Sequence, residues 1–334
     1  MKKALTLIFL IFFLLTFLLI RPYYLFLSQT LKISPLRTLL SLDSLKSFDD
    51  HVTILILGIA GYNYEGGTLS DSMIVADFNL KTHKLLTISL PRDIWSDTLE
   101  DKINTAYAYG EAKQKNGGLK LAKAEIEAVV GIPIQYATVI DFAKFKELID
   151  ILDGVDINVE RSFTDHKFPI PGRENDTCRG DTDLKCRYES ITFNKGLTHM
   201  DGKTALIYVR SRHASGVEGS DFARNKRQQK ALGAIKNRLA TTLEKLDLAY
   251  WKKLYQSFDS LLTRDITNQQ AAILLKNILT PPNFSQAEIL LSQDFFLVPN
   301  QSSYNGQYAL VPKDGNFTNI HQYIRSKQKG EKKN

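Results

Sequence analysis

A long helix late in the chain is expected to begin with arginine and amide side chains on its inward face. The sequence predicts this helix over Phe222–Leu239, with an apolar stripe that starts at Leu232. Steps of four residues back from Leu232 reach Gln228 and then Arg224, so these side chains extend the stripe. A solvated helix face is the ordinary interpretation of a basic run, but an unpaired charge on the core side is costly to bury. The position therefore favours a binding role for Arg224 and Gln228.

Further basic residues surround the start of this helix. Arg227 lies in its first turns, and Arg210 and Arg212 stand just upstream, where an extended segment would place both on one face. The N–H groups and dipole at a helix N-terminus attract an anion. Arginine binds phosphate oxygens in a two-point geometry that lysine cannot provide. The converging guanidinium groups predict a phosphate or pyrophosphate ligand.

Two shorter motifs earlier in the chain could complete such a site. Asp71 lies in Ser70-Asp71-Ser72, between a Gly-rich turn and a predicted strand, and its carboxylate could hold Mg²⁺ together with phosphate. The same tripeptide is also ordinary turn chemistry. Arg92 and Asp93 follow a predicted strand, at the end where open sheets usually contact ligands. Arg92 could therefore bind phosphate or pair with Asp93.

An uncharged apolar run near the N-terminus has the length of a membrane span. Residues 4–20 carry no charge, and two tyrosines close behind them suit the membrane interface. Lys2 and Lys3 precede the run, which predicts a cytoplasmic N-terminus and an extracytoplasmic remainder. A cleaved signal peptide is the alternative, but the run meets Arg21-Pro22 rather than a small-x-small cleavage site. The sequence therefore predicts an uncleaved single-pass anchor in the cell membrane.

Cysteine usage and charge agree with a domain outside the cytoplasm. Cys178 and Cys186 lie close together in the polar stretch Gly172–Glu189, which predicts a disulfide rather than a metal site. The formal net charge is +7, part of it in the basic segment Arg325–Asn334, for which we predict disorder. Basic chains often bind nucleic acid, but an exported domain would instead meet anionic lipids or polymers.

Strands and helices are mixed through the rest of the chain. We predict strands over Val52–Leu57, Met73–Phe78, Lys84–Leu90, Ile134–Ile140, Val155–Val159, Ala287–Leu291 and Ala309–Val311. We predict helices over Leu36–Leu45, Ile103–Lys115, Leu119–Val130, Phe142–Leu152, Gly202–Tyr208, Phe222–Leu239, Thr241–Ser260 and Asn268–Leu279. The pattern predicts an α/β fold with α-β-α layers. The expected organisation is an N-terminus and anchor over 1–27, a juxtamembrane segment over 28–47, one domain over 48–324 and a tail over 325–334.

Several blocks, taken in this order, resemble the LytR-CpsA-Psr family of membrane-anchored bacterial cell-wall transferases. The resemblance runs from about Val52 to Leu239. Its blocks are Leu55–Gly58, Ser70–Met73, Ile88–Asp93, Lys102–Tyr107, Leu152–Asp156, Asp201–Gly202, Ala205–Leu206, Arg210–Arg212, Asp221–Arg224 and Arg227–Gln229. Any one block would be weak evidence, whereas the ordered set with a matching topology is specific.

The resemblance implies a mixed α-β-α domain and a transfer reaction. A glycopolymer would move from a polyprenyl-pyrophosphate carrier to peptidoglycan or another envelope acceptor, with Mg²⁺ or Mn²⁺ assisting. Asp71 would contact the metal, Asp93 could assist it, and Asp221 would orient the arginines or activate the acceptor hydroxyl. The residues implied to hold the pyrophosphate are Arg92, Arg210, Arg212, Arg224, Arg227 and Gln228.

Two positions depart from the family pattern. Leu69 stands where many members have an arginine, and Ala60 stands where many have an acidic residue after the first strand. The metal site is therefore expected to have fewer protein ligands, with Asp93 or additional water in place of the missing one.

Three alternatives to transfer follow from the same residues. Water in place of the acceptor would give a polyprenyl-pyrophosphate phosphohydrolase. A membrane-tethered binder of anionic envelope polymer would use the arginines without catalysis. DNA binding through Arg210–Arg227 would require a cytoplasmic domain, which the predicted orientation of the anchor opposes.

Overall fold

The structure is a computed structural model of the 334-residue chain. It describes residues 2–41, 43–61, 66–170, 172–173, 175–242, 247–292 and 294–329. The side chains of Asp221, Phe222, Asn225 and Leu232, and of several residues before Ile11, lie outside this description. The chain forms two compact units, which are treated separately: unit 1 is 1–59, 69–140 and 262–334, and unit 2 is 60–68 and 141–261. The chain leaves unit 1, builds unit 2 and then returns to unit 1. The single domain over 48–324 stays a prediction.

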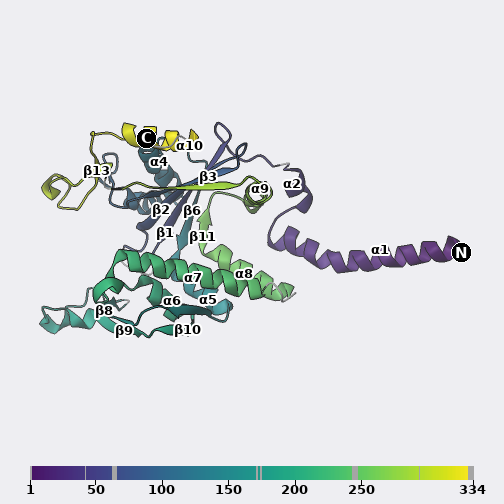
Figure 1. The fold of residues 1–334 in the computed structure, drawn as a ribbon, viewed down its shortest axis with the longest axis horizontal. Coiled ribbons are helices and arrows are strands. Elements are labelled where there is room, and N and C mark those ends of the chain that lie inside the picture. The colour runs from purple at the N-terminus through teal and green to yellow at the C-terminus, as the bar shows by residue number, and fades with distance from the viewer. Residues whose placement is uncertain are drawn as a thin grey trace. The chain divides into compact units, whose positions relative to one another are not determined.

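Unit 1 is built on a six-stranded mixed sheet with strand order β11-β6-β1-β2-β3-β12 (Figure 1). The strands are β1 (His51–Ile59), β2 (Ser70–Asn79), β3 (Lys84–Leu90), β6 (Tyr136–Asp141), β11 (Leu262–Arg264) and β12 (Ser285–Leu290). β1, β2 and β3 pair antiparallel in sequence, whereas β12 adds to β3 in parallel. All but β11 overlap strands predicted from the sequence.

Helices cover both faces of this sheet, and the alternation of side chains along each strand decides which face a residue meets. Leu55 and Leu57 of β1 join the core under α3 (Ala106–Lys113), α4 (Gly118–Val130) and α10 (Thr318–Lys329), whereas Val52 and Ile54 meet α9 (Asn268–Leu279). A central strand buried on both faces has the near-continuous apolar run seen in β1. The α-β-α layering predicted from the sequence is confirmed.

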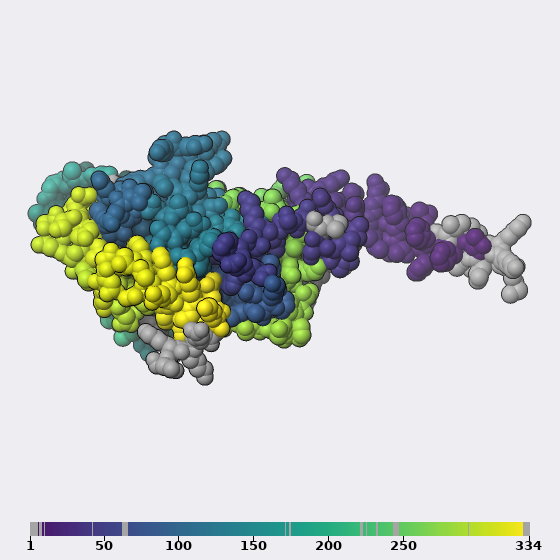
Figure 2. Space-filling view, turned by 90° about the horizontal axis from the view of Figure 1, so that it is seen from above, coloured from purple at the N-terminus to yellow at the C-terminus, as the bar shows by residue number. Residues whose placement is uncertain are grey.

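The N-terminal part of unit 1 is helical. Helix α1 (Lys2–Leu25) continues into a short π-helical turn, η1 (Phe26–Thr30), and α2 (Pro35–Leu40) follows after four residues. The stretch Ile11–Thr30 is long and apolar enough to cross a membrane, and none of it is buried by the protein (Figure 2). Helix α2 is shorter than the Leu36–Leu45 helix predicted from the sequence.

Unit 2 packs helices against two strand pairs. Its helices are α5 (Phe145–Ile151), α6 (Gly202–Arg210), α7 (Asp221–Thr242) and α8 (Leu248–Ser260), and its strands are β7 (Val155–Val159), β8 (Phe163–Pro169), β9 (Tyr188–Phe193) and β10 (Gly196–Met200). β10 pairs with β7, and β9 pairs with β8, both antiparallel. Gly202 starts α6 where an added Cβ would lie 2.1 Å from the carbonyl oxygen of Lys146 in α5. A glycine is therefore required for α5 and α6 to pack this closely.

Short elements complete both units. They are β4 (Trp95–Ser96), β5 (Asp101–Lys102), β13 (Phe296–Leu297), β14 (Val311–Pro312) and the 3₁₀ turns η2 (Ile103–Thr105), η3 (Phe142–Lys144), η4 (Cys178–Gly180), η5 (Lys185–Arg187), η6 (Gly216–Gly219) and η7 (Gln301–Ser303).

Two segments differ from the prediction. The β8–β9 hairpin, which was not predicted, has the polar stretch Gly172–Glu189 as its connection apart from the first residues of β9. The disorder predicted from Arg325 onward is wrong as far as Lys329, because α10 continues to that residue and buries Ile324 completely against the sheet. Residues 330–334 lie outside the described part of the chain.

Candidate functional site

In unit 1, Asp71 and Arg92 meet where β2 begins and β3 ends. Arg92 Nη1 lies 2.5 Å from Asp71 Oδ1. Its Nε lies 3.7 Å from Asp93 Oδ2, and Lys102 Nζ lies 3.2 Å from Asp93 Oδ1. The antiparallel pairing of β2 with β3, which aligns Met73 with Leu90, brings the ends of both strands together. The structure therefore joins Asp71, Arg92 and Asp93, and adds Lys102 to them.

These residues offer limited ligation for a divalent cation. Asp71 is the exposed carboxylate, and one of its oxygens already accepts from Arg92, while Asp93 is shared between Arg92 and Lys102. Magnesium is often held by one or two carboxylates, with substrate phosphates and water completing six ligands. Asp71 fits that role only together with phosphate oxygens. Mg²⁺ thus remains an expectation for this position.

In unit 2, the segment Tyr208–His213 is held by a buried carboxylate. Asp165 of β8 is fully buried, and its Oδ2 accepts from Ser211 Oγ at 2.6 Å, from the Arg212 N–H at 2.9 Å and from the His213 N–H at 3.2 Å. Burial raises the pKa of Asp165, but these hydrogen bonds outweigh it, so the pKa lies below its ordinary value. Asp165 therefore stays charged and fixes the backbone that carries Arg212.

A buried arginine holds the same segment from its carbonyl side. Arg227 of α7 donates from Nε to the Tyr208 carbonyl at 3.1 Å and from Nη2 to the Ser211 carbonyl at 2.6 Å. Its Nη1 donates to the Glu218 carbonyl and carboxylate at 3.0 and 3.2 Å. The guanidinium also lies 4.8 Å from the centre of the Phe163 ring. Asp165 thus binds N–H groups of this turn, and Arg227 binds its carbonyl groups.

The position of Arg227 changes its predicted role. Only 3% of the residue is exposed, and each guanidinium nitrogen donates to the protein. Burial lowers its pKa from the ordinary value, with Glu218 opposing that shift. A guanidinium engaged in this way orients the turn rather than facing a ligand, so we assign Arg227 a positioning role in place of the predicted phosphate contact.

The inward face of α7 differs from the predicted one. Its buried row is Ala223, Arg227, Ala231 and Ile235, in steps of four residues. Gln228 is exposed and Arg224 is half-buried, so the prediction of an inward-facing Gln228 is wrong. The row is displaced by one residue because small alanines, which carry little hydropathy signal, form the close contact.

The remaining predicted residues lie around this turn. Arg210 is the last residue of α6 rather than part of a strand, and Ser211 caps the helix with extended backbone. The Arg212 side chain is exposed, while Arg210 and Arg224 are half-buried and each engages another group of the protein. Asp221 begins α7, but its side chain lies outside the described part of the structure. The structure gathers Arg210, Arg212 and Arg227 at one turn of unit 2.

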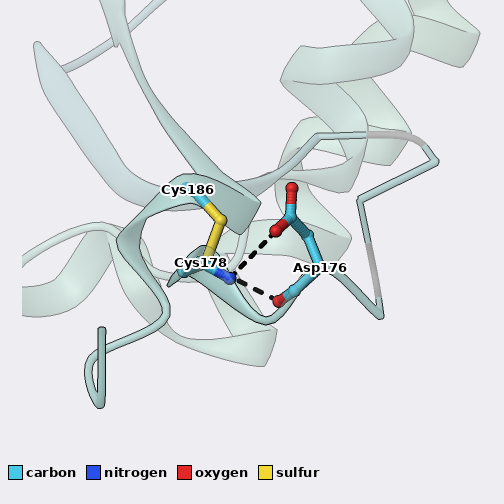
Figure 3. A group of neighbouring side chains, drawn as sticks. All are labelled: Asp176, Cys178 and Cys186. Carbon is cyan, nitrogen blue, oxygen red and sulfur yellow. Dashed lines mark hydrogen bonds between the residues drawn. A yellow bond between two sulfur atoms is a disulfide. The ribbon is translucent and has the colours of Figure 1, made fainter. Parts of the chain in front are cut away.

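The two cysteines form the predicted disulfide (Figure 3). The Cα atoms of Cys178 and Cys186 lie 5.5 Å apart, and the Cys178 N–H donates to Asp176 Oδ1 at 2.9 Å. Asp176 and the two sulfurs are close enough to resemble a metal site. Both thiols are consumed by the bridge, so the cluster staples the loop between β8 and β9.

Comparison with known proteins decides the family. The model of the LytR_cpsA_psr family matches residues 32–322, which is most of the chain. The chain belongs to the LytR-CpsA-Psr family. The match includes the Asp71–Arg92 group and the turn held by Asp165 and Arg227.

Curated relatives of this LytR-CpsA-Psr chain are named transferases. The chain is 30% identical over 199 residues to the polyisoprenyl-teichoic acid–peptidoglycan teichoic acid transferase TagU of Bacillus cereus, covering 58% of this chain and 55% of that protein. It is 31% identical over 204 residues to TagV of Bacillus subtilis, covering 58% and 46%. The chain spans about half the length of the curated relatives it matches.

Solved structures share the LytR-CpsA-Psr chain's fold. A protein of Enterococcus faecalis described as a transcriptional regulator matches with a TM-score of 0.53 and 22% identity, over 86% of this chain and 92% of that one. A protein of Streptococcus agalactiae matches with a TM-score of 0.52 and 19% identity, over 85% and 90%. At this level of identity the likeness shows the fold alone.

Proposed function

We propose that this protein is a membrane-tethered phosphotransferase that moves a glycopolymer from a polyprenyl-pyrophosphate carrier to peptidoglycan or another envelope acceptor. Family membership and the transferase names of the relatives support the reaction class. The observation that carries the proposal is the turn Tyr208–His213. Two buried charges, Asp165 and Arg227, hold its backbone while the side chain of Arg212 stays exposed. An exposed guanidinium on a backbone held in this way suits a phosphate ligand.

The proposed step exchanges one P–O bond for another. The acceptor hydroxyl oxygen attacks the phosphorus next to the glycopolymer, and the bond from that phosphorus to the bridging oxygen breaks. Polyprenyl phosphate leaves with the electron pair, and the hydroxyl proton passes to a base, for which Asp221 is the candidate. The product is a phosphodiester between the glycopolymer and the acceptor.

The chain's own residues bind and orient the phosphates in this proposal. Negative charge grows on the equatorial and leaving oxygens, so donors fixed before the reaction lower its barrier. Arg212, Arg210 and Arg224 are assigned to the pyrophosphate, with Asp165 and Arg227 as positioning residues. In unit 1, Arg92 is assigned to phosphate and Asp71 to a divalent cation, which when bound would neutralise phosphate charge.

The test uses the full chain in phospholipid nanodiscs, supplied with a polyprenyl-pyrophosphate-linked oligosaccharide and a peptidoglycan fragment. Transfer is measured as labelled glycan on the acceptor together with released polyprenyl phosphate. Arg212→Ala should lower the transfer rate by about 100-fold, the usual effect of removing one preorganised donor. Arg179→Ala is the matched control, because Arg179 is an exposed arginine in the disulfide loop of the same unit. Equal transfer by the Arg212→Ala chain and the wild type would disprove the assignment.

The same assay distinguishes a phosphohydrolase and a tethered binder from the transferase. Release of polyprenyl phosphate without an acceptor, and without labelled acceptor when one is present, identifies a phosphohydrolase. Binding of the lipid that survives EDTA, with no lipid phosphate released at any metal concentration, identifies a tethered binder.

A further inference from the structure

Helix α2 carries an exposed apolar face directly after the candidate membrane span. Leu36, Leu39 and Leu40 are each more than half exposed, and their spacing of three and four residues places them on one side of the helix. Lys32 and Arg37 beside them are exposed cations, of which Arg37 also pairs with Asp43 at 3.3 Å. Leucines flanked by exposed cations are typical of helices that lie in a membrane interface.

The opposite side of α2 is fastened to α9 (Figure 1). Gln269 Nε2 donates to Thr38 Oγ1 at 2.8 Å, and Lys276 Nζ donates to the Leu39 carbonyl at 2.6 Å. Leu275 and Leu279 of α9 are more than half exposed and lie four residues apart, on one side of that helix. The exposed leucines of α2 and α9 therefore belong to two helices that contact each other directly.

The connection from the candidate membrane span to α2 is short. Five Cα–Cα steps from Thr30 to Pro35 reach less than about 20 Å even when fully extended. The Leu31 N–H also donates back to the Phe26 carbonyl at 3.1 Å, while the Leu31 carbonyl accepts from Asn268 Nδ2 at 2.7 Å. A bilayer crossed by the span must therefore lie beside α2 and the adjoining part of α9.

We propose that Leu36, Leu39 and Leu40 of α2, with Leu275 and Leu279 of α9, form a membrane seat that rests in the interface of the phospholipid bilayer. A single transmembrane helix leaves the attached domain free to tilt and rotate. A second apolar contact, bonded rigidly to the span and to the sheet-covering helix α9, sets the height and tilt of unit 1 above the bilayer. This assignment is independent of the proposed transfer reaction.

The test measures contact with acyl chains by tryptophan quenching. Full chains carrying Leu39→Trp or Leu279→Trp are placed one per nanodisc, in ordinary or acyl-brominated phosphatidylcholine, and compared with the wild type and its two native tryptophans. Leu197→Trp is the matched control, because Leu197 is 75% exposed on β10 and Leu279 is 71% exposed. Bromine should remove at least half of the added fluorescence at the two seat positions and leave the control unchanged.

Three other outcomes would each contradict the proposed membrane seat. Absence of quenching at both seat positions shows that they do not meet the bilayer, and equal quenching of the control shows that the contact is not specific. Seat quenching that disappears at one chain per disc, while cross-links between chains form at higher loading, identifies a second copy as the occupant.

Discussion

At the scale of single residues, the candidate site depends on two buried charges that serve the backbone. Asp165 accepts from N–H groups of the segment Tyr208–His213, and Arg227 donates to its carbonyls. A buried charge is tolerated when hydrogen bonds replace its hydration. The cost of burying Asp165 and Arg227 is therefore offset only while the turn keeps this conformation, which makes the turn rigid.

Replacing Asp165 by asparagine tests this argument. The amide keeps one acceptor oxygen, but its NH₂ group replaces the other oxygen. That NH₂ group then faces N–H donors whose hydrogen bonds the carboxylate accepts in the wild type. The free energy of unfolding should fall by about 2–4 kcal/mol, as expected when a buried charged acceptor is lost. Urea denaturation of the full chain measures it. Asp156→Asn is the control, because Asp156 is about half exposed and pairs with His199 at the surface, so its loss should cost less than about 1 kcal/mol.

The difference in stability between the wild type and Asp165→Asn should depend on pH. The pKa of Asp165 is lowered in the folded protein, so its contribution is fully present above the unfolded pKa of about 3.9 and is lost as the pH falls through the folded value. The difference in the free energy of unfolding between the wild type and Asp165→Asn should be constant from about pH 5 to 7, because this range lies about one unit or more above the unfolded pKa. The difference should shrink below about pH 4. A difference that grows on acidification would contradict the assignment.

At the scale of elements, α10 is attached to the sheet through a buried carboxylate. Asp77 of β2 is 1% exposed and accepts from Thr53 Oγ1, from His51 Nδ1 and from Gln328 Nε2 of α10 at 2.8–2.9 Å. The hydrogen bond with Asp77 raises the pKa of His51, against the effect of burial. A protonated His51 therefore stabilises the region in which α10 meets β1 and β2.

This attachment should weaken as the pH rises. A raised histidine pKa contributes stability that is fully present below the unfolded value of about 6.5 and is lost as the pH passes the folded value. The difference in unfolding free energy between wild type and His51→Gln should therefore be larger at mildly acidic pH than at alkaline pH. His166→Gln, at an exposed position of β8, provides the control. A pH-independent difference for His51→Gln would refute the predicted pairing.

The disulfide acts on the loop between β8 and β9. Cys178 and Cys186 stand eight positions apart in the sequence. Closing a loop of that length lowers the entropy of the unfolded chain and so stabilises the folded state by about 2–3 kcal/mol. A chain with both cysteines replaced by serine should lose this amount of unfolding free energy in urea. A reductant should shift the wild type equally and leave the serine variant unchanged. If the reductant has no effect on the wild type, the bridge makes no contribution to stability.

Local patterns predicted the elements better than they predicted the contacts between them. Alternating and continuous apolar runs located β1, β2, β3 and α4 because burial imposes their periods. Asp165 gave no such signal: its partners stand 46 to 48 residues later, and a short acidic side chain in a polar stretch is ordinary. The inward face of α7 was misplaced because the buried row includes the small residues Ala223 and Ala231, which carry little hydropathy signal. The sequence predicted most of the strands and helices, but it did not predict the direction in which the side chains of α7 point.

At the scale of the whole molecule, the proposed reaction requires both units. Arg92 and Asp71 belong to unit 1, and Arg212 belongs to unit 2, whose chain is inserted into the path of the first. The family resemblance assigns Arg92 and Arg212 to the same reaction, and the energetic coupling between the two residues can be measured directly.

A double-mutant cycle on binding of polyprenyl pyrophosphate makes that measurement. Arg92→Ala and Arg212→Ala should each weaken binding, and the double variant should lose less than their sum. Residues that share a ligand are typically coupled by about 0.5–3 kcal/mol, whereas independent sites add to within about 0.5 kcal/mol. Arg179→Ala combined with Arg212→Ala supplies the additive reference. Strict additivity for Arg92 and Arg212 would mean that the two units do not hold the same phosphates, and the assignment of Arg92 to the pyrophosphate would have to be abandoned.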